Sequence, residues 1–596
     1  MENNAKERAK KILAKFQKAR ERRQHKDAKW RELVEFYRGE QWDKSGKIPP
    51  WIPKPVTNYI HLVTTTKRAA FAIENPIGML RPLSEADEEA INKLQRIYEY
   101  EWKHVKARKY IREAIETGKL LGTGIVQVYF DDTIIGGGTG TMYEGEVRMR
   151  HIDPATFFPD PTAHTLEDCQ FVHIVERKSI EWLKKHPIFG PKMKNVQERK
   201  VSDNERGEIY SHSGNASFDG MIDFHTHYEK IPNTWKDETG EPIGGFRYRV
   251  TYMAGEHIVH EIENLLPAMY PFAIYYDYPQ RQDFWGKSTA ELVLDNQKLI
   301  NKIESIMALI GTQLQNPQRI VHKMSGIDPR AVAKYGHAPG HVFVSNMEPS
   351  RAMTWATPPE IPPALFNLAE RARENIREIT GITQSYMGET VGSLQTSSGV
   401  RQLIERATMR DRDQMFDVEL FIEDLTRLFI AYITHHYTEE RYIRITQDYG
   451  EDYVFEEYVG SEFNGLNFDF EIDVTAQAPV TRQRMQEELE RLLQYQGQYG
   501  HMFDVNLVIP EDVINYGNFA DKGKMLARMK RERIVNRTQL AFEVASMMAE
   551  ALQGGVPPEE VQKMGMAMLE QREEQLRKGI GSANTGQHQM SQGAIG

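Results

Sequence analysis

The chain has 596 residues, more than one hydrophobic core usually spans, so several structural modules are expected. Its mean hydropathy is −0.58, and because no run of about 20 apolar residues occurs, no membrane-spanning helix is expected. The single cysteine, Cys169, excludes a disulfide within the chain and a cysteine-ligated zinc or iron–sulfur site. The net charge of −10 argues against a protein that grips nucleic acid over its whole surface.

Residues 1–38 are predicted to form a basic amphipathic helix that ends near Gly39. Its apolar stripe is thin and consists of Ile12, Leu13, Phe16, Leu33, Val34 and Phe36. The helix is therefore either an arm that contacts nucleic acid or a neighbouring subunit, or a solvated helix packed through its thin face. Prolines from Pro49 to Pro55 then predict an extended link.

The next segment reads as helices followed by antiparallel strands. Helices are predicted at 56–73, 84–104 and 106–120, and strands at 125–130, 145–150, 221–232, 245–253, 256–263 and 272–278. The glycine-rich run 136–140 lacks the Gly-Lys-Ser/Thr ending of a phosphate-binding loop, so it is interpreted as a hairpin turn.

Several His and Asp residues in this segment are candidate metal ligands. They are His151, Asp153, Asp160, His164 and Asp168, but their spacing matches no metal motif, and Asp-Pro pairs are typical of turns. His225 and His227 are predicted to share one face of a strand, because side chains repeat every two residues. A pair on the sheet surface is the favoured interpretation, ahead of a metal site.

A long helix is predicted to begin at Ser288 and to run for about 28 residues. Residues 318–361 change to short strands and turns rich in proline, and a second helix covers 364–380 and stops before Gly381. A small, polar, glycine-rich loop, 382–398, precedes a helix of about 39 residues that would be about 58 Å long.

The remaining chain is predicted to hold three strands and then helices. The strands are placed at 440–446, 452–458 and 467–475, and the helices begin at Thr481 and continue at 510–527, 536–553 and 557–578. The Gly- and Gln-rich tail 580–596 is expected to be disordered.

The helix–loop–helix in the middle of the chain carries a family resemblance. Ile379-Thr-Gly-Ile382, Gly388-Glu389 and Gln395-Thr-Ser-Ser-Gly-Val400 resemble the portal (head-to-tail connector) proteins of tailed bacteriophages. The resemblance implies an α+β, mainly helical protomer with a wing, long stem helices, a small α/β clip, a tunnel loop and a helical crown. Such protomers assemble into a ring, which closes with twelve subunits in that family.

This order of parts implies the following domain boundaries. They are 1–55 for the basic helix and link, 56–286 for the wing, 287–316 for the stem helix, 317–361 for the clip, 362–381 for the second stem helix, 382–398 for the tunnel loop, 399–480 for the long tunnel-side helix and wing strands, 481–579 for the crown, and 580–596 for the tail.

The resemblance also implies a function. The ring would form a channel at one capsid vertex of the virion, assembled in the host cytoplasm, through which the terminase motor packages double-stranded DNA and from which DNA is ejected into the tail. Expected partners are further copies of the chain, the terminase large subunit, the major capsid protein and scaffold, and the tail adaptor. No enzymatic activity, cofactor or membrane association is expected.

Two groups of candidate site residues follow. Polar side chains of the tunnel loop are expected to face DNA: Gln384, Ser385, Glu389, Thr390, Ser393, Gln395, Thr396 and Ser397. Basic side chains of the clip are expected to dock the motor and then the adaptor: Arg319, His322, Lys323, Arg330 and Lys334.

Two other function classes are weighed against the portal. A different virion connector or adaptor is disfavoured because adaptors usually lack this helix–clip–helix order. A DNA-processing enzyme such as a metal nuclease needs clustered carboxylates, whereas the adjacent pair Asp131-Asp132 has no partners in the sequence pattern. No Walker A motif occurs, which removes the ATP-driven packaging motor as an interpretation.

Overall fold

In the computed structural model, the structure describes residues 2–71, 78–83, 87–136, 143–195, 220–233, 244–315, 317–336, 338–356, 360–382, 397–446, 453–466, 468–471 and 492. The chain separates into two compact units, residues 1–441 with 458–478, and residues 442–457 with 479–596. The described part of the second unit is chiefly the antiparallel pair β12 (Arg441–Thr446) and β13 (Tyr453–Tyr458). The fold is of the α+β class, as the sequence predicts.

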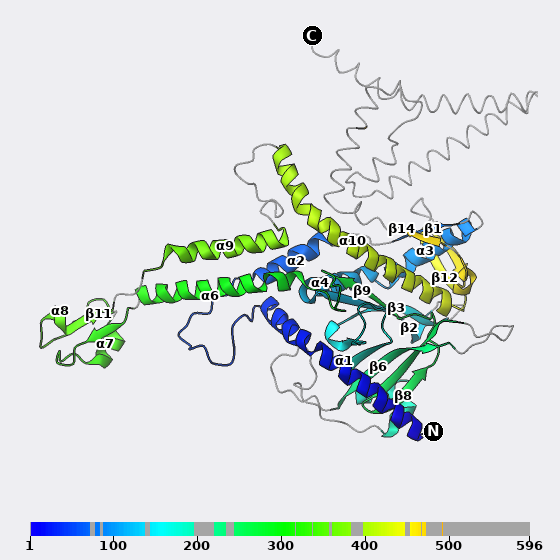
Figure 1. Ribbon diagram of the computed structural model, residues 1–596, viewed down its shortest axis with the longest axis horizontal. Helices are drawn as coiled ribbons and strands as arrows, with labels where there is room; N and C mark the ends of the chain where they lie inside the picture. Colours follow the sequence, from blue (N-terminus) through cyan, green and yellow to red (C-terminus); the bar gives the residue numbers. More distant parts are fainter. Residues whose placement is uncertain are drawn as a thin grey trace, which may run out of the picture. The chain divides into compact units, whose positions relative to one another are not determined.

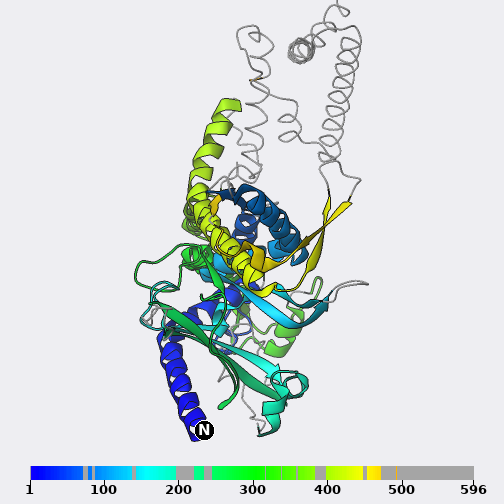
Figure 2. The same ribbon diagram turned by 90° about the vertical axis from the view of Figure 1, so that its right-hand side faces the viewer.

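The first unit contains an antiparallel five-stranded sheet of order β4-β5-β6-β7-β8. Its strands are β4 (Phe157–Pro159), β5 (Phe171–Ser179), β6 (Met221–Pro232), β7 (Phe246–Ala254) and β8 (His257–Ile262). Helix α1 (Glu2–Tyr37) lies along one face of this sheet in both views (Figures 1 and 2). A short helix, α5 (Ile180–Lys185), follows β5, and its Ile180 and Leu183 pack with Phe224 of β6.

Helix α1 is held by its own chain. Its small and apolar side chains are buried against the sheet, where Ile12 packs on Met253, and Phe16 on Phe158 and Phe171. The basic side chains also bind the sheet, since Arg8 lies in ion-pair distance of Glu229 and Glu261. The structure therefore supports the interpretation of α1 as a helix packed through its apolar face, rather than as a free arm.

A second antiparallel sheet, of order β3-β2-β9, forms the centre of the unit. Its strands are β2 (Thr123–Gly136), β3 (Tyr143–Ile152) and β9 (Phe272–Tyr276), and the helices beside it are α2 (Tyr59–Ala70), α3 (Glu88–His104) and α4 (Ala107–Leu121). Helix α4 ends at Gly122, whose φ of 93° and whose closeness to Gly286 both require glycine, because a Cβ there would stand 2.2 Å from the Gly286 carbonyl oxygen.

Three long helices follow this sheet in the chain. They are α6 (Thr289–Gln315), α9 (Pro363–Thr380) and α10 (Ser397–His436). Between α6 and α9 lies a small module made of β10 (Arg319–Val321), α7 (Pro329–Tyr335), α8 (Pro349–Ala352) and β11 (Met353–Trp355), in which β10 and β11 pair antiparallel. Helices α6 and α9 run side by side and carry this module at their far end (Figure 1).

The long elements agree with the sequence prediction to within a few residues. The predicted strand 221–232 coincides with β6, and the helices predicted from Ser288, at 364–380 and up to Tyr437 coincide closely with α6, α9 and α10. The sequence pattern did not predict β4, β5, α5 or β1 (Met79–Pro82). Strand β1 pairs antiparallel with β14 (Phe468–Glu471), which lies far away in the sequence.

Parts of the predicted organisation lie outside the described residues. They include the tunnel loop between 383 and 396 and, apart from residue 492, the crown and the tail. Among the helices that are described, none is both long enough and apolar enough to cross a membrane.

Candidate assembly and docking site: the α6–α9 hairpin and its end module

The start of α6 is fixed by a buried ion pair. The Lys119 Nζ of α4 lies 2.7 Å from Oδ1 of Asp277, and both side chains are fully buried. The other carboxylate oxygen, Oδ2, accepts hydrogen bonds of 2.6 Å from the backbone N–H and the hydroxyl of Thr289, the first residue of α6. An acceptor at this position satisfies a backbone donor that the helix itself leaves free.

The same ion pair also holds α10. The side-chain oxygen of Gln414 accepts a hydrogen bond of 2.9 Å from Lys119 Nζ, and its Nε2 donates to Asp277 Oδ1 over 3.2 Å. The Lys119 ammonium also lies over the ring of Phe71, 4.0 Å from its centroid. One buried charge pair therefore joins α4, α6 and α10.

A row of buried polar side chains on α6 forms hydrogen bonds with the extended segment that follows α1, between Gln41 and Thr57. Gln297 donates to the Thr57 carbonyl over 2.8 Å, and Asn301 donates to the side-chain oxygen of Gln41 over 2.7 Å. One turn further on, the Ser305 hydroxyl donates to the Pro53 carbonyl over 2.6 Å. The prolines keep the link extended, so its carbonyls can meet successive turns of α6.

Helix α9 packs on α6 through small residues. The buried side chains of α9 are Ala369, Ala372, Ile376 and Thr380. An ion pair also joins the two helices, since the Arg373 guanidinium lies 3.0 Å from the Glu304 carboxylate of α6. Helix α9 ends at Gly381, whose φ of 72° places it in the left-handed region where glycine is favoured. Ile382 then turns into the main core, which fixes the start of the predicted loop.

The far end of the hairpin exposes large apolar side chains. On α6, Leu314 is 53% exposed, and on α9, Phe366 is 54% exposed. The end module exposes Met324, Val342 and Val344 by 75% or more. Exposed apolar side chains that gather in one region mark an interaction surface rather than an isolated subunit.

The end module is held together by Arg319, one of the predicted docking residues. Its Nη1 donates to the Val332 carbonyl over 2.6 Å, and its guanidinium lies over the Trp355 ring, 4.9 Å from the centroid. Gly336 makes room for it, because a Cβ there would stand 1.6 Å from Nη1. Arg319 is therefore half-buried and tied to its own module.

The other four predicted docking residues are exposed. They are His322, Lys323, Arg330 and Lys334, all within the same module. Of these, Lys334 lies over the ring of Tyr335, 5.1 Å from its centroid. The structure therefore brings the basic residues together on one small module, and their docking role stays a prediction.

The predicted tunnel-loop residues from Gln384 to Thr396 lie outside the described residues. Ser397 is the first residue of α10, and its side chain is not among those described.

Two of the candidate metal ligands, Asp153 and Asp160, act as turn residues, whereas His151 lies in strand β3. The Asp153 carboxylate accepts from the Ala155 N–H, and that of Asp160 accepts from Thr162 and Gln170. Over the described residues, no group of three or more His, Cys, Asp or Glu side chains is arranged to hold a metal ion.

His225 and His227 share one face of β6, as predicted, but the sheet-surface interpretation is wrong. His225 is 6% exposed and His227 is fully buried, because α1 covers this face. His173 of β5 lies between them, 2.9 Å from His225 and 3.2 Å from His227 by ring nitrogens, and the Phe16 ring stacks on it with centroids 4.9 Å apart. Burial lowers the pKa of His173 well below its usual value and that of His225 to about 4.

Sequence reasoning missed the buried charge pair and His173. Lys119 and Asp277 are 158 residues apart, and neither lies in a motif, so no local pattern links them. A signal for His173 was available, since Phe171, Val172, Ile174 and Val175 around it form a short apolar run rich in β-branched residues, but the segment was interpreted from its Asp-Pro turns instead.

A helical hairpin that exposes apolar side chains at its far end is the kind of surface that an interaction partner covers. The chain matches the model of the phage P22-like portal protein family over residues 13–579, and it belongs to this family. Portal proteins are structural parts of the virion at the capsid vertex, where they serve as head-to-tail connectors in genome packaging.

Proposed function

We propose that copies of this chain close into a ring, a dodecamer in the manner of the family, whose axial channel passes double-stranded DNA. In this proposal α6 and α9 are the stem helices, residues 317–361 are the clip, 382–398 form the tunnel loop, and 481–579 form the crown. The terminase large subunit drives DNA inward through the ring, and DNA later leaves into the tail.

The observation that carries the proposal is the α6–α9 hairpin in a chain of the portal family. Within one subunit, α9 buries chiefly Ala369, Ala372, Ile376 and Thr380 against its neighbours, and it leaves Phe366 and Leu368 54% and 41% exposed. Head-to-tail contacts close into a ring when the rotation between copies permits it, and a ring of hairpins would cover these side chains.

The partners follow from the ends of the hairpin. The clip, with exposed Lys323, Arg330 and Lys334, is proposed to dock the terminase and then the tail adaptor. The wing and crown are proposed to meet the major capsid protein and scaffold. This assignment needs no cofactor and no enzymatic step by the chain itself.

The tunnel loop is proposed to line the narrowest part of the channel. Its Gln, Ser and Thr side chains can form hydrogen bonds with phosphates without a strong charge, and Glu389 repels them. Each cationic contact with a phosphate adds affinity, so a loop without lysine or arginine favours sliding over capture.

Lysine substitutions in the loop test the channel. Gln384→Lys, Ser385→Lys and Gln395→Lys together add three positive charges per subunit. Multiplied around a ring, these charges should clamp DNA and slow or stall packaging, measured as the length of DNA packaged per particle over time. Ring assembly should be intact. Packaging at the unmodified rate would show that this loop does not line the constriction.

A further inference from the structure

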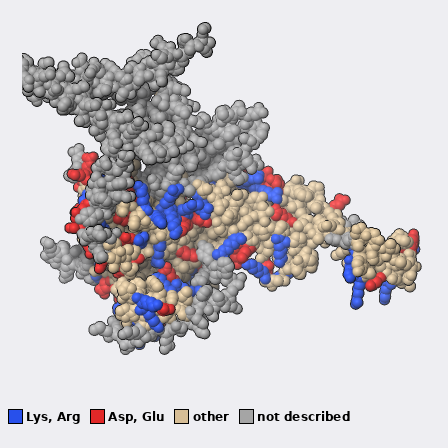
Figure 3. Space-filling model, turned by 180° about the vertical axis from the view of Figure 1, so that it is seen from behind, with Lys and Arg blue, Asp and Glu red and all other residues tan. Residues whose placement is uncertain are grey.

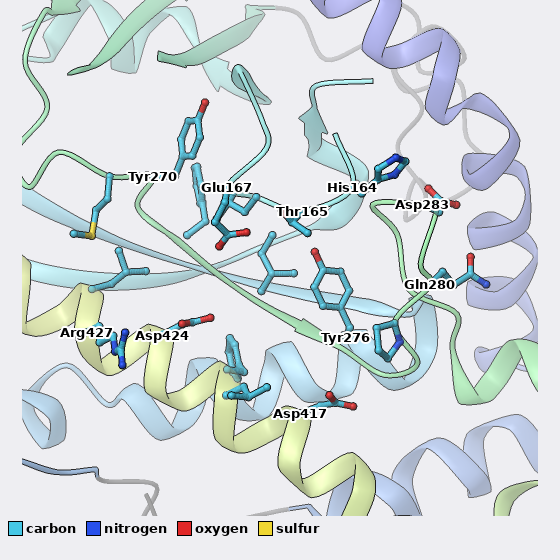
Figure 4. A pocket seen from close by; sticks show the side chains of 18 of the residues that line it. His164, Thr165, Glu167, Tyr270, Tyr276, Gln280, Asp283, Asp417, Asp424 and Arg427 are labelled. Carbon is cyan, nitrogen blue, oxygen red and sulfur yellow. The ribbon is translucent and has the colours of Figure 1, made fainter. Parts of the chain in front are cut away.

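A cavity of about 550 Å³ opens beside α10 in the first unit. Its apolar floor comes from α10 and β9, and its polar rim comes largely from carboxylates. Glu167, Asp417 and Asp424 line it, and Figure 4 shows the Glu167 and Asp424 carboxylates pointing into the space, with the Tyr276 hydroxyl beside them. We call this cavity the acidic groove.

Among the described lining residues, carboxylates outnumber cations in the acidic groove, and Arg427 only partly offsets the raised pKa of Asp424. Of its other charged residues, Asp283 is paired with Lys26 at 3.2 Å, and Arg427 is paired with Glu423 at 2.5 Å. Burial, and after it the negative charges of Glu167 and Glu423, raise the pKa of Asp424 to about 6. An added cation would relieve this repulsion.

The groove is suited to an arginine side chain. Besides its carboxylates, it presents the rings of Tyr248, Tyr270 and Tyr276. A guanidinium can form two parallel hydrogen bonds with a carboxylate and can stack on an aromatic face, so this combination of groups favours arginine over most other side chains.

The first unit also carries an unmatched basic surface. Residues 103–112, at the end of α3 and the start of α4, hold five Lys or Arg residues and no Asp or Glu. Lys103, Lys106, Arg108, Lys109 and Arg112 are all exposed. We call this segment the basic corner; from behind, Lys and Arg side chains gather on that face of the molecule (Figure 3).

The basic corner has little to bind within its own chain. Lys109 forms a wide ion pair with Glu113, at 3.8 Å and with both side chains well exposed. Lys103, Lys106, Arg108 and Arg112 form no ion pair with any residue that the structure describes. Lys106 has a φ of 58°, so the chain turns sharply here and presents residues from two helices together.

The acidic groove and the basic corner are formed by different residues around the central sheet. Side chains along a strand alternate between faces, and Phe272, Ile274 and Tyr276 of β9 line the groove. Tyr275, between them, points the other way and packs on α4, where a Cβ on Gly118 would stand 2.5 Å from its ring.

Helix α10 also presents different residues to the groove and to α3. Its groove side carries Asp417, Phe421 and Asp424, whereas Thr426 and Phe429 contact Tyr98 and Trp102 of α3. At about 3.6 residues per turn, these two sets lie about half a turn apart around the helix. One protomer therefore offers two different, oppositely charged surfaces.

We propose that the acidic groove of one copy receives the basic corner of the next copy, with Arg108 or Arg112 entering between the carboxylates and the tyrosine rings. Two distinct complementary surfaces on one subunit are what a head-to-tail contact requires. The contact deepens the proposed function, because it rests on ring assembly and names the surfaces that join neighbours. Electrostatic complementarity would also set the register between them.

Two charge-reversed variants test the contact. The groove variant is Glu167→Lys with Asp424→Lys, and the corner variant is Arg108→Glu with Arg112→Glu. Each alone places like charges across the contact, so each should lose ring assembly in native mass measurement and electron microscopy while its circular dichroism is unchanged. Mixed in equal amounts, the two variants should form rings again, because each groove then meets a corner of opposite charge.

Matched controls carry the same change of charge elsewhere. Lys10→Glu with Lys11→Glu on exposed turns of α1 controls for the corner variant, and Glu256→Lys with Glu440→Lys controls for the groove variant. Both controls should form rings like the unmodified chain.

Each other outcome has a defined meaning. Rings from either variant alone, or no rings from the mixture, would overturn the contact. If the corner variant forms rings but loses binding to double-stranded DNA, the basic corner is a nucleic-acid surface instead, and the proposed contact is wrong. Failure of the unmodified chain to form rings would instead overturn the proposed function itself.

Discussion

Single residues decide how the long helices are held, and the clearest case is the ion pair between Lys119 and Asp277. Both side chains are fully buried, and they bind partners on α6 and α10. Because a buried charge that loses its partner keeps its desolvation cost, the pair is sensitive to removal of either member.

Substitution Lys119→Met should lower the free energy of unfolding by about 3–5 kcal/mol, because Asp277 stays buried without its cation. Urea unfolding of the full chain measures this change. Lys185→Met is the matched control, since the Lys185–Glu181 pair is 76% and 78% exposed and its removal should leave the free energy of unfolding nearly unchanged. A loss below about 1 kcal/mol for Lys119→Met would show that the pair does not hold the helices.

The buried histidines predict a dependence of stability on pH. His173 and His225 lie under Phe16, and His227 lies beside Phe171. The charged groups that face the three histidines are Glu229, Asp223, Lys15 and Arg8. Burial is the largest cause of the lowered pKa of each histidine. Since the unfolded chain then binds more protons than the folded chain below the ordinary histidine pKa, acid favours unfolding.

The free energy of unfolding should therefore be constant with respect to these groups above about pH 6.5 and should fall as the pH drops toward 4. The shift of His225 to about 4 corresponds to a loss of up to about 3 kcal/mol. Denaturant unfolding at pH 7.5 and 4.5 measures it, and His225→Gln should reduce the fall. The exposed His257→Gln should leave the fall unchanged; an equal fall in the His225 variant would contradict the assignment.

At the scale of elements, periodicity predicted the long helices and most strands well. Helix α6 and strand β6 have strong patterns and clear end signals, so their bounds were predictable within a residue or two. Strands β4 and β5 were missed because Asp-Pro turns around Pro154 and Pro161 hide them. The residues of β5 alone cannot reveal that it pairs with β6, a strand about 50 residues later in the sequence.

Helix α1 shows why a basic helix was hard to interpret. Arg23 is only 2% exposed, and it donates to the carbonyls of Pro154, Ala155 and Phe157. From sequence, an arginine in a basic run indicates a solvated face, and the carbonyls that receive it come from a turn more than 130 residues away. The helix could therefore be predicted from the sequence, but the residues that Arg23 binds could not.

The clip is the element whose docking role can be tested most directly. Charge reversal at Lys323 and Lys334 should weaken docking of the terminase, because both side chains are exposed and the substitutions remove only the Lys334–Tyr335 ring contact among the module's described internal contacts. Binding of the terminase large subunit to purified rings measures the effect, and Lys10→Glu on α1 is the control. Unchanged docking and normal packaging would remove the clip from this role.

Arg319 should behave differently from the exposed basic residues. It binds the Val332 carbonyl and the Trp355 ring, so it stabilises the module rather than facing a partner. Of the five basic residues predicted for docking, the structure thus gives this one an additional internal role, which the composition of the segment alone could not reveal.

At the scale of the whole molecule, charge and assembly fit together. A net charge of −10 on each copy opposes tight binding of DNA over the surface, which suits a conduit more than a clamp. The exposed apolar side chains at the end of the α6–α9 hairpin, together with the acidic groove and the basic corner, are surfaces that neighbouring copies would cover in the proposed ring.

Particle imaging of the purified protein tests this account most directly. Electron microscopy, with native mass measurement of the same sample, should show closed rings with a central hole and a mass near that of twelve copies. Rings should form most readily at low salt, since screening weakens contacts between charged faces. A protein that stays a monomer at every salt concentration would contradict the account.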